Sequence, residues 1–144
     1  MNNFYLSPSN LTYHHYTSIV SRVLAFGWSC TYLWPKEAFK LDYFLNGKTL
    51  IRSIRALSRS DIFISYIPGT FSSCIELGMA YTLCEEVFLA TRDPIHFTQT
   101  CLADAHLAAL PKIKRVCCDI EDIPILLEQE YLYMIDFRRR QQHY

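Results

Sequence analysis

The sequence lacks the features of a metal, redox or dinucleotide centre. No two of its six cysteines are spaced as C-x-x-C, and the chain has neither a Walker loop nor a G-x-G-x-x-G fingerprint. An excess of one charge is also missing, because 14 basic residues balance 14 acidic ones. These absences predict reduced cysteines, no metal or other cofactor, and no general attraction to a nucleic acid polymer or an anionic membrane.

Long apolar runs are missing as well. No stretch approaches the length that spans a bilayer, and no basic N-terminal segment leads into an apolar one, so we expect a cytoplasmic protein. Internal repeats, low-complexity tracts and interdomain linkers are also lacking. With 144 residues, 51% of them hydrophobic, the chain is predicted to form one domain, 1–144.

Apolar spacing predicts strands that alternate with helices along the chain. Residues 36–48 are irregular and are expected to form a loop or a short helix. The expected strands are 3–7, 29–34, 61–67, 86–90 and 115–120, and the expected helices are 12–26, 48–59, 72–84, 97–109 (weaker) and 122–135.

This alternation predicts right-handed crossovers and a parallel sheet. The expected fold class is α/β: a Rossmann-like, flavodoxin-like three-layer sandwich with a five-stranded parallel sheet. Ligands of such sheets bind beyond the carboxyl ends of the strands. Three segments should meet there: 5–10, 68–76 and 91–96.

The carboxylate of Glu76 lies in an uncharged run that begins after Asp61 and ends at Glu85. One interpretation is a capping box with Ser73, since the two residues have the S-x-x-E spacing. The other is a functional group. Its neighbours are small or apolar, and partial desolvation would raise its pKa and suit it to nucleophilic or acid/base chemistry.

Three stretches resemble the nucleoside 2-deoxyribosyltransferase-like superfamily, which includes the deoxyribosyltransferases and the nucleoside 5'-monophosphate N-glycosidases. They are "FYLSPS" from residue 4, "SRSDIFISYIPG" from residue 58, and "SSCIELGMAYTLCEEVFLA" from residue 72. The E-L-G-x-A element at 76–80 is the most specific of them. The resemblance implies a glutamate nucleophile, Glu76, that forms a glycosyl-enzyme intermediate, and a tyrosine, Tyr5, that orients it. From the sequence alone, Tyr5 could equally be a core aromatic.

The expected substrate is a small-molecule nucleoside or nucleoside 5'-monophosphate, whose N-glycosidic bond is cleaved or exchanged. Hydroxyls and free N–H groups at the start of the third long helix would suit a phosphate, although capping and turn formation explain them too. The expected substrate-binding residues are Ser7, Pro68, Gly69, Thr70, Ser72, Ser73, Gly78, Arg92 and His96. The resemblance also implies a homodimer or larger homo-oligomer, with Tyr131, Tyr133 and Phe137 as candidate interface aromatics.

The chain departs from the family pattern at two places. Ser53 stands where members usually carry an aspartate that protonates the leaving base, and the loop "GTFSS" lacks the acid of the deoxyribosyltransferases. His14 or His15 could replace the missing acid, or both could be surface residues. Asp61 begins a strand at the end opposite the expected site and is interpreted as structural.

Two other functions stay open from the sequence. One is a nucleotide-binding protein with a sensing or regulatory role, which keeps the fold but has reduced catalytic activity. The serine at position 53, in place of the usual aspartate, favours this function. A structural or interaction protein of the same fold would bind no nucleotide. Release of free base that depends on Glu76 separates the enzyme from both.

Overall fold

A computed structural model describes residues 2–39, 47–69, 71–98 and 109–142. The strands are β1 (Asn3–Leu6), β2 (Ser29–Cys30), β3 (Ile62–Tyr66), β4 (Glu86–Thr91) and β5 (Ile113–Cys117). The α-helices are α1 (Tyr13–Ala25), α2 (Gly47–Ser58), α3 (Phe71–Leu83) and α5 (Ile123–Gln142). Short 3-10 helices cover Lys36–Phe39, Pro94–Phe97 and Ile120–Asp122.

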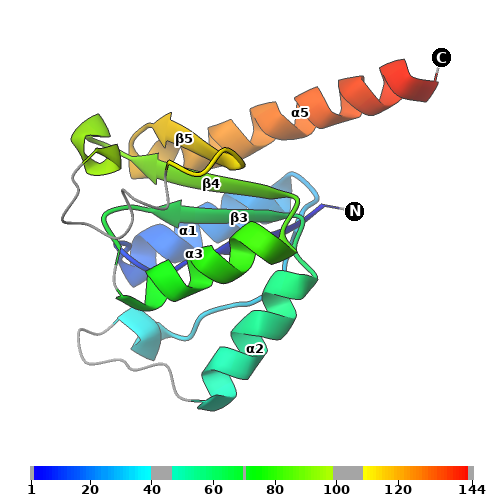
Figure 1. The fold of residues 1–144 in the computed structure, drawn as a ribbon. Helices are drawn as coiled ribbons and strands as arrows, with labels where there is room; N and C mark the ends of the chain where they lie inside the picture. The colour runs from blue at the N-terminus through cyan, green and yellow to red at the C-terminus, as the bar shows by residue number, and fades with distance from the viewer. Residues whose placement is uncertain (1, 40–46, 70, 99–108, 143–144) are drawn as a thin grey trace.

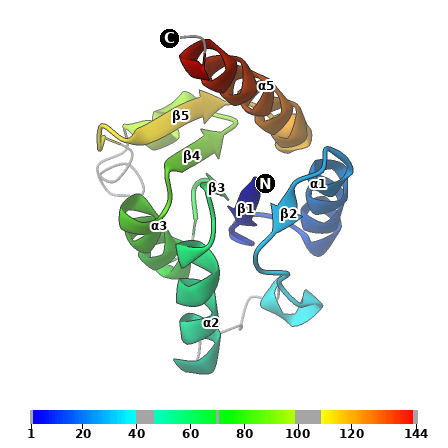
Figure 2. The same ribbon diagram turned by 90° about the vertical axis from the view of Figure 1, so that its right-hand side faces the viewer.

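The five strands form one parallel sheet in the order β2-β1-β3-β4-β5. Helices α2 and α3 cover one face and α1 and α5 the other, so the molecule has three layers (Figures 1 and 2). This order is the flavodoxin-like one, whose crevice lies at the carboxyl ends of β1 and β3. The predicted fold class is confirmed.

The sheet is the centre of the core. Every residue of β3 is buried, and β4 is buried after its first residue, as expected for central parallel strands covered on both faces. At the amino-terminal edge, the Asp61 carboxylate accepts a 2.8 Å hydrogen bond from the backbone N–H of Asn3. Asp61 therefore joins β1 to β3 far from the carboxyl edge, which agrees with its structural interpretation.

The second strand is shorter than predicted. Only Ser29 and Cys30 pair with β1 as a strand. The backbone N–H of Thr31 still donates to the carbonyl oxygen of Phe4 at 3.0 Å, and beyond Thr31 a side chain holds the chain. The Tyr16 hydroxyl donates to the carbonyl oxygen of Tyr32 at 3.1 Å and accepts from the backbone N–H of Trp34 at 3.0 Å. Trp34 is buried there and Tyr32 is half-buried.

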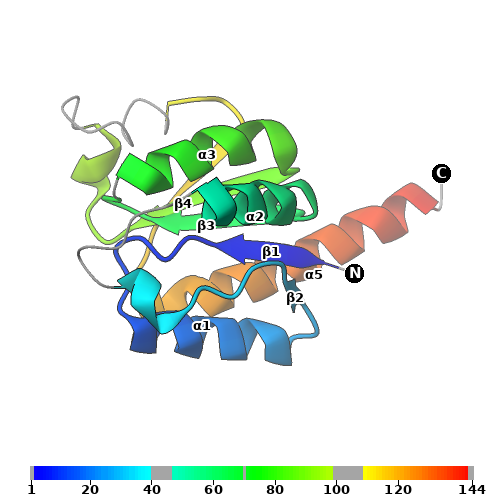
Figure 3. The same ribbon diagram turned by 90° about the horizontal axis from the view of Figure 1, so that it is seen from below.

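Two predicted boundaries near the C-terminus were also wrong. Strand β5 begins two residues and ends three residues earlier than expected, because its pairing with β4 starts at Ile113 and Lys114, which the predicted strand left out. Helix α5 continues to Gln142 through a polar segment that holds an Asp136–Arg140 ion pair of 2.7 Å, and its end extends past the sheet (Figure 3). The weaker helix predicted at 97–109 lies largely outside the described residues; at its start, Phe97 ends a 3-10 helix.

Candidate active site

Glu76 lies on the face of α3 that packs against the sheet. It shares this buried stripe with Ser73, Leu77 and Ala80, and its own side chain is 2% exposed. The helix begins at Phe71, so Ser73 is already inside the first turn and is not the residue that caps it. The capping-box interpretation is therefore wrong. The Glu76 carboxylate is directed at β1 instead.

Two hydroxyl groups from the first strand and its following loop contact this carboxylate. The Tyr5 hydroxyl donates to Oε2 of Glu76 at 2.6 Å, and the Ser7 hydroxyl lies 3.4 Å from Oε1. The Ser7 backbone N–H bonds to the carbonyl oxygen of Ile64 at 2.9 Å, which extends the pairing of β1 with β3 to this point. The fold thus brings together three of the residues predicted for the site.

Burial raises the pKa of the Glu76 carboxyl to about 7, although the hydrogen bonds from Tyr5 and Ser7 lower it in part. The predicted desolvation of this group is confirmed. Burial, followed by the charge of Glu76, raises the pKa of Tyr5 well above its usual range. Tyr5 therefore stays protonated and remains a hydrogen-bond donor, whereas Glu76 changes its charge near neutral pH.

Aromatic rings hold Tyr5 in this orientation. Its ring stacks on Phe63 at 5.7 Å and on Tyr32 at 6.3 Å between centroids, and the Trp34 ring meets it edge-on at 6.4 Å. Tyr5 is thus both a core aromatic and a partner of Glu76. The roles of Tyr32 and Trp34 were missed because "SCTYLW" has the pattern of a regular strand; the high aromatic content, 15%, was the only signal.

The loop between β3 and α3 is closely packed where Gly69 faces two hydroxyls. A Cβ at Gly69 would collide with the Ser73 hydroxyl and lie 3.1 Å from both Ser73 Cβ and Ser9 Oγ. Pro68, which precedes it, follows a cis peptide bond. Thr70 lies outside the described residues, and for Ser72 only the helical backbone is described.

Gly78 was expected to bind substrate, because a residue without a side chain lets another group come close, but no described atom lies close to the position of its missing Cβ. It lies on the exposed side of α3, and a Cβ there would meet nothing within 4 Å among the residues described. Glu76 and Gly78 therefore point to opposite sides of the helix.

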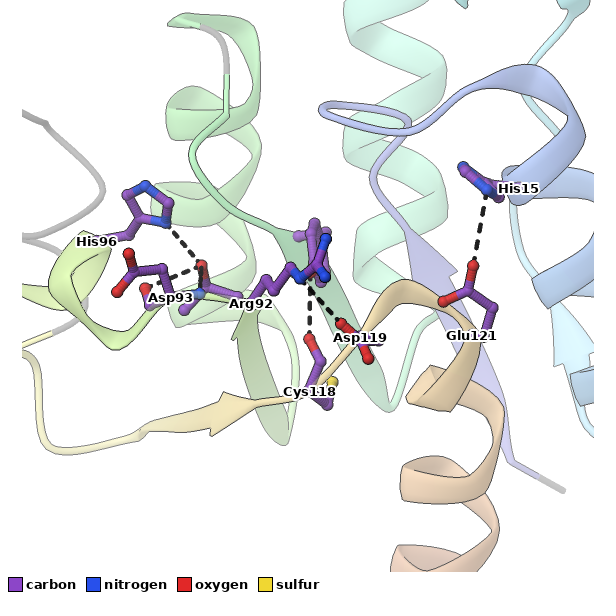
Figure 4. Close-up of polar contacts among 9 residues, drawn as sticks. His15, Arg92, Asp93, His96, Cys118, Asp119 and Glu121 are labelled. Carbon is purple, nitrogen blue, oxygen red and sulfur yellow. Dashed lines mark hydrogen bonds and ion pairs between the residues drawn. The ribbon is translucent and has the colours of Figure 1, made fainter.

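Arg92 and His96 lie at the carboxyl end of β4, in a polar cluster of their own (Figure 4). Arg92 Nε is 3.3 Å from Asp119 Oδ1, with the arginine side chain 84% exposed. The His96 ring nitrogen Nδ1 is 2.8 Å from the buried Thr91 hydroxyl. No contact joins either residue to Glu76 in the described structure.

The two histidines of α1 lie on its outer side. His14 is exposed and His15 is half-buried, and His15 Nε2 is 3.9 Å from Glu121 Oε1. The surface interpretation of both residues is thus favoured. Ser53, in contrast, is fully buried on α2. Its hydroxyl offsets part of the increase in the pKa of Tyr5 that burial and Glu76 cause.

Comparison with solved structures finds a fold of the same kind. The structure of the CMP N-glycosidase BcmB from Clostridium botulinum matches 89% of this chain and 99% of its own, with a TM-score of 0.59 and 12% sequence identity. This chain has the fold of that glycosidase. The fold implied by the E-L-G-M-A resemblance is confirmed by this match. No family model matches the chain, and no curated protein does.

Within the described ranges, no group of three or more His, Cys, Asp or Glu side chains could hold a metal ion. Among the helices described, none is long and apolar enough to cross a membrane.

Proposed function

We propose that this chain cleaves the N-glycosidic bond of a nucleoside 5'-monophosphate, with Glu76 as the nucleophile. The observation that carries the proposal is the buried Tyr5–Glu76 hydrogen bond of 2.6 Å at the carboxyl end of the sheet. A buried carboxylate that loses its proton near pH 7 and is fixed by a short hydrogen bond has the properties of an enzymatic nucleophile. The likeness to a CMP N-glycosidase supports the same reaction class.

The proposed reaction has two steps. Oε1 of Glu76 attacks the anomeric carbon C1', the C1'–N bond breaks, and its electron pair leaves with the base. Water then attacks C1' of the glycosyl ester, which releases the sugar phosphate and restores the carboxylate. The water supplies one proton, which ends on the free base. A carboxylate nucleophile thus replaces one difficult displacement with two easier ones.

The two carboxylate oxygens are held differently, which supports this assignment of roles. Tyr5 binds Oε2 tightly, whereas the Ser7 contact with Oε1 is 3.4 Å long and correspondingly weak. Oε1 is therefore the oxygen with the freer lone pair. Tyr5 fixes the rotation of the carboxylate, so that Oε1 keeps one direction.

The phosphate part of the proposal rests on the start of α3. Backbone N–H groups and the positive end of the helix dipole favour an anion there, and the loop that carries Gly69 leads directly to it. The sequence adds hydroxyl side chains to this segment as neutral donors. A 5'-phosphate near the helix start would leave the sugar over Glu76, one and a half turns further along the same helix.

The test is release of free base from a panel of nucleosides and their 5'-monophosphates, followed by chromatography. Wild-type protein should release base from at least one monophosphate, and Glu76→Gln and Glu76→Ala should lose the activity. Glu85→Gln is the matched control, because Glu85 is exposed just beyond α3. Adding a second free base tests exchange. No release from any substrate, with nucleotides still raising the melting temperature, would establish a binding protein instead.

A further inference from the structure

Two serine hydroxyls in the core are buried without a hydrogen bond. Ser53 on α2 is fully buried, and Ser65 on β3 is 1% exposed. Neither Oγ has a hydrogen-bond partner among the described residues. No described contact ties Ser53 to the candidate site, whereas the strand pairing places Ser65 beside it. An unpaired buried hydroxyl destabilises a fold, so a serine in this place indicates a partner that it meets at another stage.

The pairing of β1 with β3 fixes where the Ser65 side chain lies. Tyr5 is opposite Phe63, and their rings stack at 5.7 Å between centroids on the face of the sheet that α3 covers. The Ser7 backbone N–H donates to the carbonyl oxygen of Ile64 at 2.9 Å, so the parallel ladder continues and brings Ser7 opposite Ser65. Side chains two residues apart on a strand share a face. Ser7 and Ser65 are therefore neighbours under α3.

The Ser7 hydroxyl is held only weakly. It lies 3.4 Å from Oε1 of Glu76, and it accepts from the backbone N–H of Ser9 at 3.4 Å, so both bonds are long. Adjacent strands lie about 4.8 Å apart, a spacing that two serine side chains can bridge by turning toward each other. Ser65 thus offers a second acceptor to a hydroxyl whose present bonds are weak.

We propose that Ser65 is a positioning residue whose Oγ accepts the Ser7 hydrogen bond when Oε1 of Glu76 joins the sugar. This inference rests on the proposed function. In the resting site, the Ser7 hydroxyl points at the oxygen that must attack. As the Oε1–C1' bond forms and the C1'–N bond breaks, Oε1 changes from a charged carboxylate oxygen to an ester oxygen, which is a poorer acceptor. The Ser7 hydroxyl then turns to Ser65, and no proton is transferred.

The role of Ser65 is confined to the step in which the ester forms. Without its Oγ, the Ser7 hydroxyl would be left buried and unpaired in the glycosyl-enzyme, which disfavours that state and the transition state before it. The resting enzyme would keep the weak bond from Ser7 to Glu76. Loss of Ser65 should therefore slow the attack without changing substrate affinity or the pKa of Glu76 in the free enzyme.

The test is base release from a 5'-monophosphate in a single turnover, with the full chain in excess. Ser65→Ala should slow this step about 5- to 50-fold, which is the effect of one unpaired buried hydroxyl. The half-saturating concentration and the pH midpoint near 7 should stay as in wild type. The melting temperature should not fall, because the substitution removes a hydroxyl that has no bond to lose.

Ser60→Ala is the matched control, because Ser60 is a buried serine whose hydroxyl has partners. Its Oγ donates to the carbonyl oxygen of Ala56 at 2.7 Å and lies 2.7 Å from Oγ of Thr31. This variant should melt at a lower temperature and keep the wild-type rate. Ser65→Thr retains a hydroxyl and suits a strand, so it should restore the rate to within about 3-fold of wild type.

A double variant, Ser7→Ala with Ser65→Ala, separates this role from a general effect of packing. Without the Ser7 hydroxyl there is no hydrogen bond to accept, so Ser65→Ala should then change the rate less than about 2-fold.

The outcomes separate this inference from the proposed function. Suppose that wild type releases base in a Glu76-dependent way. The role of Ser65 is then overturned, and that of Glu76 kept, by a Ser65→Ala rate within 2-fold of wild type, by a shifted pH midpoint, or by an equal loss with and without the Ser7 hydroxyl. If wild type releases no base from any monophosphate, both proposals are overturned.

Discussion

The Tyr5 hydroxyl donates a 2.6 Å hydrogen bond to Oε2 of Glu76, across 71 positions of sequence. Both groups are buried, and the parallel pairing of β1 with β3 brings them together. The bond fixes the orientation of the Glu76 carboxylate. It also lowers the pKa of that carboxyl, which burial alone would raise further.

Tyr5→Phe removes this donor while keeping the ring. We expect kcat/KM for base release to fall about 10- to 100-fold, because a hydrogen bond to a charged group contributes about 1.5–3 kcal/mol. The rate should rise with pH through about 7 in the wild type, where Glu76 loses its proton, and the variant's midpoint should be higher. A pH profile of kcat/KM for both proteins measures this. An unchanged midpoint would contradict the role of Tyr5.

Tyr16→Phe is the control for removing a buried phenol. The Tyr16 hydroxyl bridges Tyr32 and Trp34 and does not touch Glu76. We expect a loss of about 1–3 kcal/mol in the free energy of unfolding, with the activity midpoint unchanged. Urea denaturation combined with the same pH profile distinguishes the two tyrosines.

Glu76 should also make stability depend on pH. Burial raises its pKa from the ordinary 4.5 to about 7, so between these values the folded state binds more protons than the unfolded state. The free energy of unfolding should therefore fall as pH rises from about 4.5 to about 7, by up to about 3 kcal/mol from this group.

Glu76→Gln removes the titrating group. Its free energy of unfolding should lack this component of the pH dependence, and the variant should be the more stable protein at pH values above about 7. Urea denaturation of both proteins across this range gives the difference curve. A difference that is flat with pH would show that Glu76 keeps an ordinary pKa.

Gly69→Ala and Gly78→Ala form a matched pair. At Gly69 the new methyl would collide with the Ser73 hydroxyl and crowd Ser9, so we expect a loss of about 1–3 kcal/mol in stability. At Gly78 it would meet no described atom, and stability should rise by about 0.5–1 kcal/mol because alanine favours the helix. Equal melting temperatures for the two variants would contradict the packing of the loop.

Lys114 links the last two strands to α5, away from the site. Its Nζ is 2.8 Å from Glu130 and 3.2 Å from Glu86, and both carboxylates are more than three-quarters buried. Lys114→Met should cost about 1–2 kcal/mol in stability, because it leaves two largely buried carboxylates without the cation between them. Arg140→Met breaks only the exposed pair with Asp136 and should change stability by less than about 0.5 kcal/mol. Thermal melts of both variants at two salt concentrations test the contrast.

Much of the fold could be predicted because the central strands are apolar on both faces. β3 and β4 stand out for this reason, and the alternation with amphipathic helices gives a parallel sheet. β5 and the end of α5 were misplaced because they are polar. Their positions are set by pairing and ion contacts, such as those of Lys114, that leave no apolar period.

The sequence predicted which residues belong to the candidate site, but not how the fold arranges them. Sequence singled out Glu76 and Tyr5, but it could not show that the helix begins at Phe71, which removes Ser73 from the cap and directs Glu76 at β1. The unpaired hydroxyl of Ser53 depends on how α2 packs against the sheet, which no local pattern encodes. The placement of Arg92 and His96 in a separate cluster likewise depends on the β4–β5 edge.

The oligomeric state implied by the resemblance stays a prediction. Tyr133 is 65% exposed on α5, while the side chains of Tyr131 and Phe137 lie outside what the structure describes. Light scattering at several protein concentrations measures the assembly. A monomer throughout would contradict the expected dimer.

The most direct test of the central claim is intact-protein mass spectrometry after incubation with a 2'-fluorinated nucleoside 5'-monophosphate. The fluorine slows both steps, and the second is expected to become slow enough for the glycosyl ester to accumulate. We predict a mass increase of one fluorinated sugar phosphate, located by peptide mapping on Glu76 and missing in Glu76→Gln. Base release without an adduct, or an adduct on another residue, would contradict Glu76 as the nucleophile.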